Sequence, residues 1–94
     1  MATLSLSALK VAFPPTRTYA CVADGHGKVL FQGVITAPRI VHLRAPRLRV
    51  NLGNSNVAVH VNGRIFRIPA SPYGLSIAPG RVSYLPKGAR PCNG

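Results

Sequence analysis

Acidic residues are almost absent from this sequence. Asp24 is the only one, and it is outnumbered by twelve Lys and Arg residues, which gives a formal net charge of +11 at pH 7. Enzymes that work with a pair of carboxylates are excluded by this count. Because the basic side chains have almost no internal partners, they must be solvated or meet an external anion.

Tryptophan is also absent, and aromatic residues make up 6% of a chain that is 47% hydrophobic. The core must therefore consist mainly of Val, Leu, Ile and Ala. No apolar run approaches the roughly 18 residues of a membrane-spanning helix. Residues 1–15 show no basic leader before an apolar stretch, so we expect a strand there rather than a signal peptide. A segment that directs the domain out of the cytoplasm would then lie outside this sequence.

The chain shows no internal repeat, low-complexity tract or linker, so we expect one domain over residues 1–94. Nine Gly and nine Pro residues are spread along it and divide it into short pieces. Short strands joined by turns fit this spacing better than long helices do.

Apolar and polar residues alternate with a period of two, most clearly in the segments 48–52 and 57–61, which predicts half-buried strands. The run Asp24-Gly25-His26-Gly27 predicts the loop of an antiparallel hairpin, and Asn62-Gly63 predicts a two-residue hairpin turn. We therefore predict an all-β fold, an immunoglobulin-like β-sandwich of about seven to eight short antiparallel strands, with a small barrel as the alternative.

The two cysteines, Cys21 and Cys92, lie far apart and lack the close spacing of a metal site. In a reducing compartment they would be a buried thiol and a thiol in the C-terminal tail. In an oxidising compartment they can form a disulfide, whose loop closure would stabilise the fold by about 4 kcal/mol. The sequence leaves both alternatives open.

Two stretches of the sequence, TYACVADGHGKVLFQGVI and LRVNLGNSNVAVHVNGRIFRIP, resemble the extracytoplasmic C-terminal domain of RodZ and related helix-turn-helix membrane proteins. The first stretch matches the family at Tyr19, Asp24, Gly27, Lys28, Val29 and Leu30. The second stretch matches at Leu52, Gly53, Asn54, Val61, Asn62 and Gly63. The resemblance covers roughly residues 3 to 92, and the helix-turn-helix part and transmembrane helix of the family have no counterpart in this chain.

The resemblance implies a fold, a location and a class of partner. It implies an extracytoplasmic domain linked to cell shape, which contacts cell-envelope or morphogenesis partners. A variant of the family carries paired cysteines at the positions of Cys21 and Cys92. The matching residues set turns and strand register, since Gly53 and Gly63 can adopt positive φ and Asn side chains can hydrogen-bond their own backbone. We therefore interpret one set as fold-defining turns: Asp24, Gly27, Gly53, Asn54, Asn62 and Gly63.

Residues that perform catalysis or bind metals are few. Cys21, His26 and Asp24 lie close in sequence, but neighbouring residues of a strand point to opposite faces, and a strand Cys is more often a core residue or half of a disulfide. His42 and His60 fall on the polar phase of their strands and can face one another across a sheet, yet two imidazoles alone make a poor metal site. We predict no enzymatic activity, no metal and no cofactor.

Arginines form the most conspicuous candidate surface. If Arg49 and Arg67 share the outward phase with His60, one sheet face becomes a basic stripe. Such a stripe is either a solvated face or a docking surface for an anionic partner. The candidate binding residues are Arg39, Arg44, Arg47, Arg49, Arg64 and Arg67.

A nucleic acid is a competing partner, because small basic barrels bind single strands when aromatic platforms accompany the charge. Only Tyr73 and Tyr84 lie in plausible loops or edges, so the sequence favours a different partner. We expect a non-enzymatic interaction module that binds a protein or an anionic cell-envelope polymer. The alternative is a small basic β protein that binds nucleic acid or assembles with copies of itself, as a coat or surface protein does.

Overall fold

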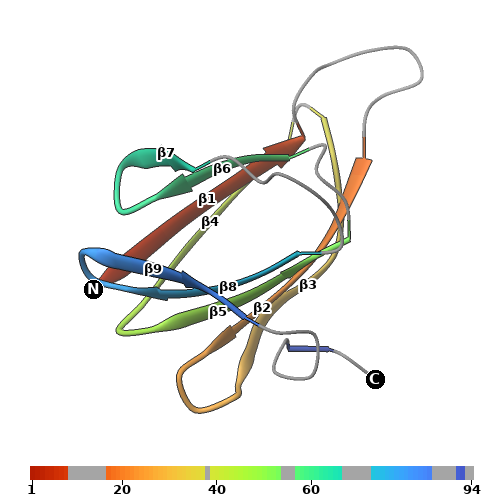
Figure 1. Ribbon diagram of the computed structural model, residues 1–94. Helices are drawn as coiled ribbons and strands as arrows, with labels where there is room; N and C mark the ends of the chain where they lie inside the picture. Colours follow the sequence, from red (N-terminus) through yellow and green to blue (C-terminus); the bar gives the residue numbers. More distant parts are fainter. Residues whose placement is uncertain (9–16, 38, 54–56, 67–72, 86–90, 93–94) are drawn as a thin grey trace.

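The computed structural model describes residues 1–8, 17–37, 39–53, 57–66, 73–85 and 91–92. Within these residues the chain forms nine strands and no helix: β1 (Ala2–Ala8), β2 (Arg17–Asp24), β3 (Val29–Thr36), β4 (Ile40–Ala45), β5 (Leu48–Leu52), β6 (Val57–Val61), β7 (Arg64–Phe66), β8 (Tyr73–Ala78) and β9 (Arg81–Tyr84). The strands build two antiparallel sheets packed face to face (Figure 1). Sheet A has the order β4-β1-β6-β7, and sheet B has the order β3-β2-β5-β8-β9. The predicted all-β sandwich is confirmed, with slightly more strands than the sequence indicated.

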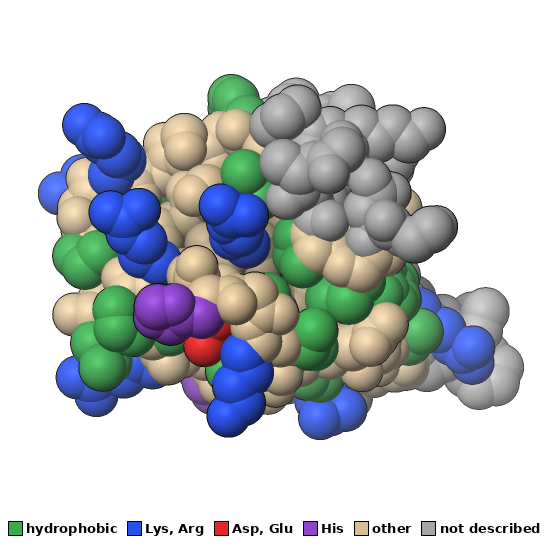
Figure 2. Space-filling view, turned by 90° about the horizontal axis from the view of Figure 1, so that it is seen from below, with side chains coloured by type: hydrophobic (Ala, Val, Ile, Leu, Met, Phe, Trp, Pro, Cys, Tyr) green, Lys and Arg blue, Asp and Glu red, His purple; other side chains and the backbone are tan. Residues whose placement is uncertain are grey.

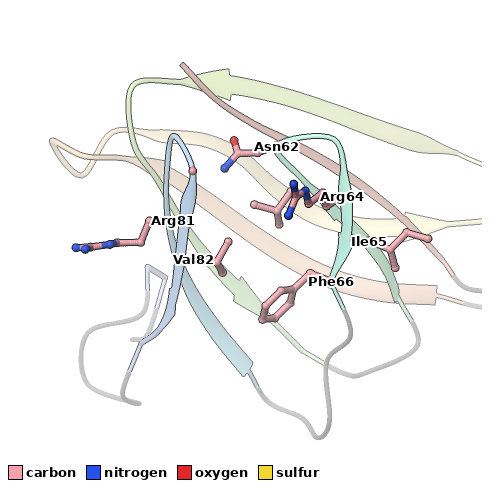
Figure 3. A pocket seen from close by; sticks show the side chains of 8 residues that line it. Asn62, Arg64, Ile65, Phe66, Arg81 and Val82 are labelled. Carbon is pink, nitrogen blue, oxygen red and sulfur yellow. The ribbon is translucent and has the colours of Figure 1, made fainter.

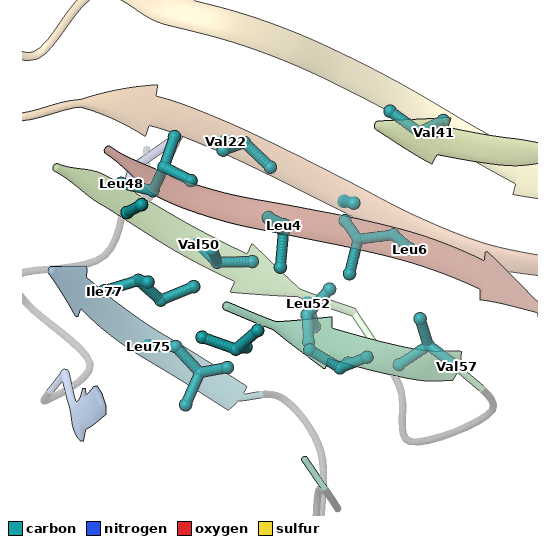
Figure 4. Packing of buried hydrophobic residues seen from close by; sticks show 14 of the residues in the cluster. Leu4, Leu6, Val22, Val41, Leu48, Val50, Leu52, Val57, Leu75 and Ile77 are labelled. Carbon is teal, nitrogen blue, oxygen red and sulfur yellow. The ribbon is translucent and has the colours of Figure 1, made fainter. Parts of the chain in front are cut away.

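The core is aliphatic, as the composition required. Alternate residues of β1, β5 and β6 are buried between the sheets, so that Leu4 and Leu6 of sheet A meet Val50 and Leu52 of sheet B (Figure 4). Each such side chain stabilises the fold by roughly 1.5–3 kcal/mol when it is fully buried. Thr18, on β2, is the exception in this interior, since its hydroxyl has no hydrogen-bond partner among the described residues.

The strand topology places four of the turns between consecutive strands at one end of the sandwich. Because all neighbouring strands are antiparallel, the turns β2–β3, β4–β5, β6–β7 and β8–β9 lie at the same end as the N-terminus. We call this the hairpin end, formed by Met1 and the segments 24–29, 44–49, 61–64 and 78–81. The turn between β4 and β5 carries the chain from sheet A to sheet B.

The loop between β2 and β3 closes around the only carboxylate of the chain. Oδ1 of Asp24 accepts hydrogen bonds from the backbone N–H groups of His26 (2.8 Å) and Lys28 (2.9 Å). Gly27 has a φ of +85°, which a residue with a side chain rarely adopts. The hairpin expected here is present, and Asp24 and Gly27 both lie at its turn.

The turn between β6 and β7 also ties the two sheets together. Asn62 and Gly63 have φ values of +51° and +82°, as the predicted two-residue turn requires. Oδ1 of Asn62 accepts a hydrogen bond from the N–H of Thr3 (3.1 Å), and Nδ2 donates one to the carbonyl of Ala78 (3.0 Å). One side chain thus links β1 and β6 of sheet A to the end of β8 in sheet B.

Gly53 is needed for a different reason from the one the sequence suggested. It does not have a positive φ, but a Cβ at this position would lie 3.0 Å from the Cβ of Tyr19. The N–H of Gly53 donates a hydrogen bond to the carbonyl of Tyr19 (2.9 Å), which holds the two backbones close. The expectation for Asn54 concerns a position outside the described residues.

Cys21 and Cys92 form a disulfide, so the oxidised alternative is the one that the structure adopts. The bridge joins positions 71 residues apart in sequence, with their Cα atoms 6.2 Å apart. Beside it, Nδ2 of Asn51 donates a hydrogen bond to the carbonyl of Pro91 (3.0 Å). Because Cys21 and Asn51 are paired neighbours on the outer side of sheet B, residues 91–92 lie against that outer face.

Candidate basic binding surface

Most of the described Lys and Arg residues lie at the hairpin end, in or next to its turns: Lys28, Arg44, Arg47, Arg49, Arg64 and Arg81. All of these side chains are exposed. Figure 2 views the molecule from below and shows blue basic side chains spread around the single red acidic one. Of the described basic residues, only Arg17 and Arg39 belong to the opposite end. The fold therefore gathers positive charge that the sequence distributes along the whole chain.

Asp24 lies within this basic surface, yet it neutralises little of it. Its Oδ1 accepts two backbone hydrogen bonds from the β2–β3 turn, with the N–H of Lys28 contributing more than that of His26, and these bonds lower the pKa of the carboxyl below its ordinary value of 3.8. The carboxylate thus serves the turn. By contrast, the arginine side chains of the hairpin end have no hydrogen-bond or ion-pair partner among the described residues.

Three of these arginines share the outer face of sheet B. Arg49 of β5 pairs with Ser76 of β8, which in turn pairs with Ser83 of β9. Arg47 lies one step before β5, and Arg81 of β9 pairs with Ala78 of β8. Arg47, Ser76, Ala78, Arg81 and Ser83 line a hollow of about 210 Å³. We call it the Arg–Ser hollow.

A larger cleft, of about 570 Å³, opens between the β6–β7 and β8–β9 hairpins. Figure 3 shows Phe66 and Val82 in its lining, to which Ile65 and Arg81 also contribute. Phe66 packs edge-on against Tyr84, with ring centroids 6.1 Å apart. This cleft is the edge of the aliphatic core where the two sheets part, and two charged residues, Arg64 and Arg81, contribute to its lining.

The single stripe predicted from the sequence is wrong in its geometry. Arg49 belongs to sheet B and His60 to sheet A, so the two side chains lie on opposite outer faces of the sandwich. Arg44 accompanies His60 on the outer face of sheet A, whereas Arg39 follows β3 and its guanidinium lies 5.6 Å from the ring centroid of Phe31. Arg67 lies outside the described residues. Neither charge nor phase reveals which sheet a strand joins.

His42 and His60 do share the outer face of sheet A, but they do not face one another. β1 runs between their strands, and both histidines pair with Ser5, whose hydroxyl is hydrogen-bonded to Nδ1 of His42 (2.9 Å). Among the described residues, no group of three His, Cys, Asp or Glu side chains is placed to hold a metal ion. Cys21 lies in the disulfide, so the conceivable Cys–His–Asp arrangement has no thiol.

Sequence reasoning missed three residues of the Arg–Ser hollow: Ser76, Arg81 and Ser83. Arg81 and Ser83 alternate with Val82 and Tyr84 in the sequence, which was a usable signal. Their proximity to Arg47 depends on the pairing of β5 with β8, two segments separated by a hairpin of the other sheet. That pairing is not local, so the pattern of residues within one strand could not reveal it.

No protein-family model, curated protein or solved structure matches the chain. The resemblance to the RodZ C-terminal domain therefore stays a prediction. Among the residues that the structure describes, no helix is long and apolar enough to cross a membrane.

Proposed function

We propose that this domain is a non-enzymatic binding module that holds an anionic polymer of the cell envelope against its hairpin end. The observation that carries the proposal is the concentration of exposed arginines at this end that have no hydrogen-bond or ion-pair partner among the described residues, next to a carboxylate that already accepts hydrogen bonds from its own turn. Arginine binds phosphate and carboxylate groups through a planar fork of donors, so such a surface suits a flexible chain of anions.

The disulfide supports a location outside the cytoplasm. Structural disulfides form and persist in oxidising compartments, and the Cys21–Cys92 bridge joins β2 to the C-terminal tail. The resemblance to the RodZ C-terminal domain points to the same location and to a role in cell shape. In that compartment an envelope polymer is a more accessible anion than nucleic acid.

The placement of aromatic residues also favours such a polymer. Binding of single-stranded nucleic acid relies on bases that stack on exposed aromatic rings. Among the described aromatic side chains, Tyr19, Phe31 and Phe66 are partly buried, and the exposed Tyr84 ends β9, away from the hairpin end. The described part of this surface therefore offers charge without a stacking platform.

Two double variants of equal net charge test whether the polymer binds at the hairpin end. Arg44→Gln with Arg64→Gln removes charge from the hairpin end, and Arg17→Gln with Arg39→Gln removes the same charge from the opposite end. We expect the first pair to weaken binding of poly(glycerol phosphate) by about tenfold and to flatten its salt dependence, and the second pair to change little. Isothermal titration calorimetry across a salt series measures both. Equal losses for the two pairs would mean that only net charge matters, and would contradict a dedicated surface.

A second candidate function is suggested by β3, one of the two edge strands of sheet B. Its free side is not paired with any described strand, and Val34 on its outward face is 51% exposed. An edge of this kind can accept an extended segment of a partner protein or of another copy. If copies associate in this way, Val34→Lys should dissociate them in sedimentation experiments; an assembly that survives this substitution does not use this edge.

A further inference from the structure

We infer that the Arg–Ser hollow is a binding site for a single phosphoryl group, with donors from Arg47, Arg81, Ser76 and Ser83. The inference rests on the proposed function, and it narrows the anionic polymer to one that carries phosphate. The sequence alone indicated Arg47 as a candidate binding residue, but not its grouping with Arg81, Ser76 and Ser83.

The shape of the hollow follows from the strand register. Ser76 and Ala78 are successive outward residues of β8, and their small side chains form the floor. Arg47 rises beside Ala78 on the β5 side, and Arg81 rises on the β9 side. Since adjacent strands lie about 4.8 Å apart, the two walls start roughly 10 Å from each other, a distance that two arginine side chains can close around one small anion.

Arg47 lies next to the turn between β2 and β3. A Cβ added at Gly25 would lie 3.2 Å from the Cβ of Arg47, so the two segments are in close contact. Arg47 also lines a second hollow, together with Asp24, Gly25 and His26. Arg47 is thus common to the lining of this second hollow and of the Arg–Ser hollow. Arg81 lines both the apolar cleft and the Arg–Ser hollow, and Figure 3 shows the end of its side chain directed away from Phe66 and Val82.

The donors match a phosphoryl group better than a carboxylate. A phosphoryl group is tetrahedral and presents acceptor oxygens in several directions, whereas a carboxylate presents two in one plane. The hollow offers guanidinium donors from both walls and hydroxyl donors from Ser76 on the floor and Ser83 on the β9 wall. Within the described residues these four side chains have no other hydrogen-bond or ion-pair partner, and no acidic side chain lines the hollow.

Arg49 adds charge next to the hollow without lining it. It pairs with Ser76 on the β5 side, one outward position further along the strand than Arg47. A phosphate-bearing chain that places one group in the hollow would therefore pass its next group near Arg49. This arrangement favours a polymer over an isolated phosphate ion, because successive charges meet successive arginines.

The first experiment uses the whole oxidised chain and small probes at constant ionic strength. We expect titration with inorganic phosphate and with glycerol 3-phosphate to shift the backbone amide resonances of Ser76, Ala78 and Ser83 saturably, and titration with acetate to leave them nearly unchanged. Shifts of similar size with acetate would overturn the assignment. A site that takes inorganic phosphate but rejects poly(glycerol phosphate) supports the phosphoryl assignment and overturns the polymer as its source.

The second experiment separates the hollow from the general charge of the hairpin end. The double variant Ser76→Ala with Ser83→Ala keeps every charge, and Ser5→Ala with Ser7→Ala is its matched control on the outer face of sheet A. We expect the first to weaken binding of poly(glycerol phosphate) by about tenfold and to leave binding of poly-L-glutamate unchanged. The control should alter neither.

Arg81→Lys keeps the charge but removes the planar fork, so it should weaken binding of the phosphate polymer by about fivefold, while Arg39→Lys at the opposite end of the sandwich should not. Unchanged affinity in the double serine variant and in Arg81→Lys would overturn the phosphoryl site, and the proposed function would survive if Arg44→Gln with Arg64→Gln still weakened binding. If neither polymer binds the unaltered protein, both the proposed function and this inference fail.

Discussion

The outer faces of the two sheets carry similar polar residues and use them differently. On sheet A, Ser5 lies between His42 and His60, and its hydroxyl is hydrogen-bonded to His42. On sheet B, Ser76 and Ser83 lie among arginines and have no side-chain partner among the described residues. A hydroxyl that is already bonded must give up that bond to bind a ligand, so the free donors of sheet B cost less to use.

The same two faces differ in what covers them. The described end of the C-terminal tail lies on sheet B, held by the disulfide at Cys21 and by the hydrogen bond from Asn51 to Pro91. The side chain of Cys21 points to this outer face and is fully buried nonetheless. Sheet B thus combines a part covered by residues 91–92 with an exposed, basic part near the hairpin end. Three predictions test what stabilises these regions.

The largest effect is expected from loss of the disulfide. Replacing both Cys21 and Cys92 by Ser should lower the free energy of unfolding by about 4 kcal/mol, because the bridge closes a long loop in the unfolded chain. Urea denaturation followed by circular dichroism measures the change. A reducing agent should produce a similar loss in the original protein and none in the variant. A loss below about 1 kcal/mol would mean that the tail adds little to sheet B.

A smaller effect is expected at the joint between the two sheets. Asn62→Ala removes the hydrogen bonds to Thr3 and Ala78. It also places alanine at a φ of +51°, a backbone conformation that Asn adopts more readily than Ala. We expect a loss of about 2 kcal/mol in the same denaturation experiment. Asn62→Gly removes the same hydrogen bonds without the backbone strain, so it should lose less. If Gly proves as costly as Ala, the hydrogen bonds between the sheets carry the effect.

The smallest effect concerns the turn at Asp24. Because backbone hydrogen bonds lower the pKa of this carboxyl in the folded state, the stability it contributes is complete above the ordinary value of 3.8 and is lost as the pH falls through the lower folded value. The stability of the protein should therefore decline more steeply below about pH 4 than that of Asp24→Asn, which has no proton to gain there. Thermal unfolding at a series of pH values compares the two; parallel curves would contradict the link between the turn and this carboxylate.

Much of the local structure could be predicted from particular residues. Leu48, Val50 and Leu52 alternate with polar residues, and they form β5 with its apolar side in the core. Asn62-Gly63 predicted a two-residue turn, and both residues have positive φ. These features depend on the period of a strand and on backbone conformations that few residues adopt, and both are properties of short segments.

The grouping of the arginines could not be predicted in the same way. Arg49 and His60 fall on the outward phase of successive strands, yet β5 belongs to sheet B and β6 to sheet A, so the thickness of the sandwich separates the two side chains. Arg81 lies far from Arg47 in sequence and shares a hollow with it. The order of the strands in the sheets decides both the separation of Arg49 from His60 and the proximity of Arg81 to Arg47. The alternation of polar and apolar residues cannot reveal this order, because it is the same in either sheet.

The sequence by itself determined that short strands would bury an aliphatic interior and that twelve basic residues would have one acidic side chain to share. It also limited the choice for Cys21 and Cys92 to a bridge or two separate thiols. Only the tertiary structure decided that the bridge forms, that the turns and their basic residues gather at one end, and that two serines lie between arginines on sheet B. The physical reason is that burial and alternation act within a segment, whereas the pairing of distant strands is settled by the packing of all segments together.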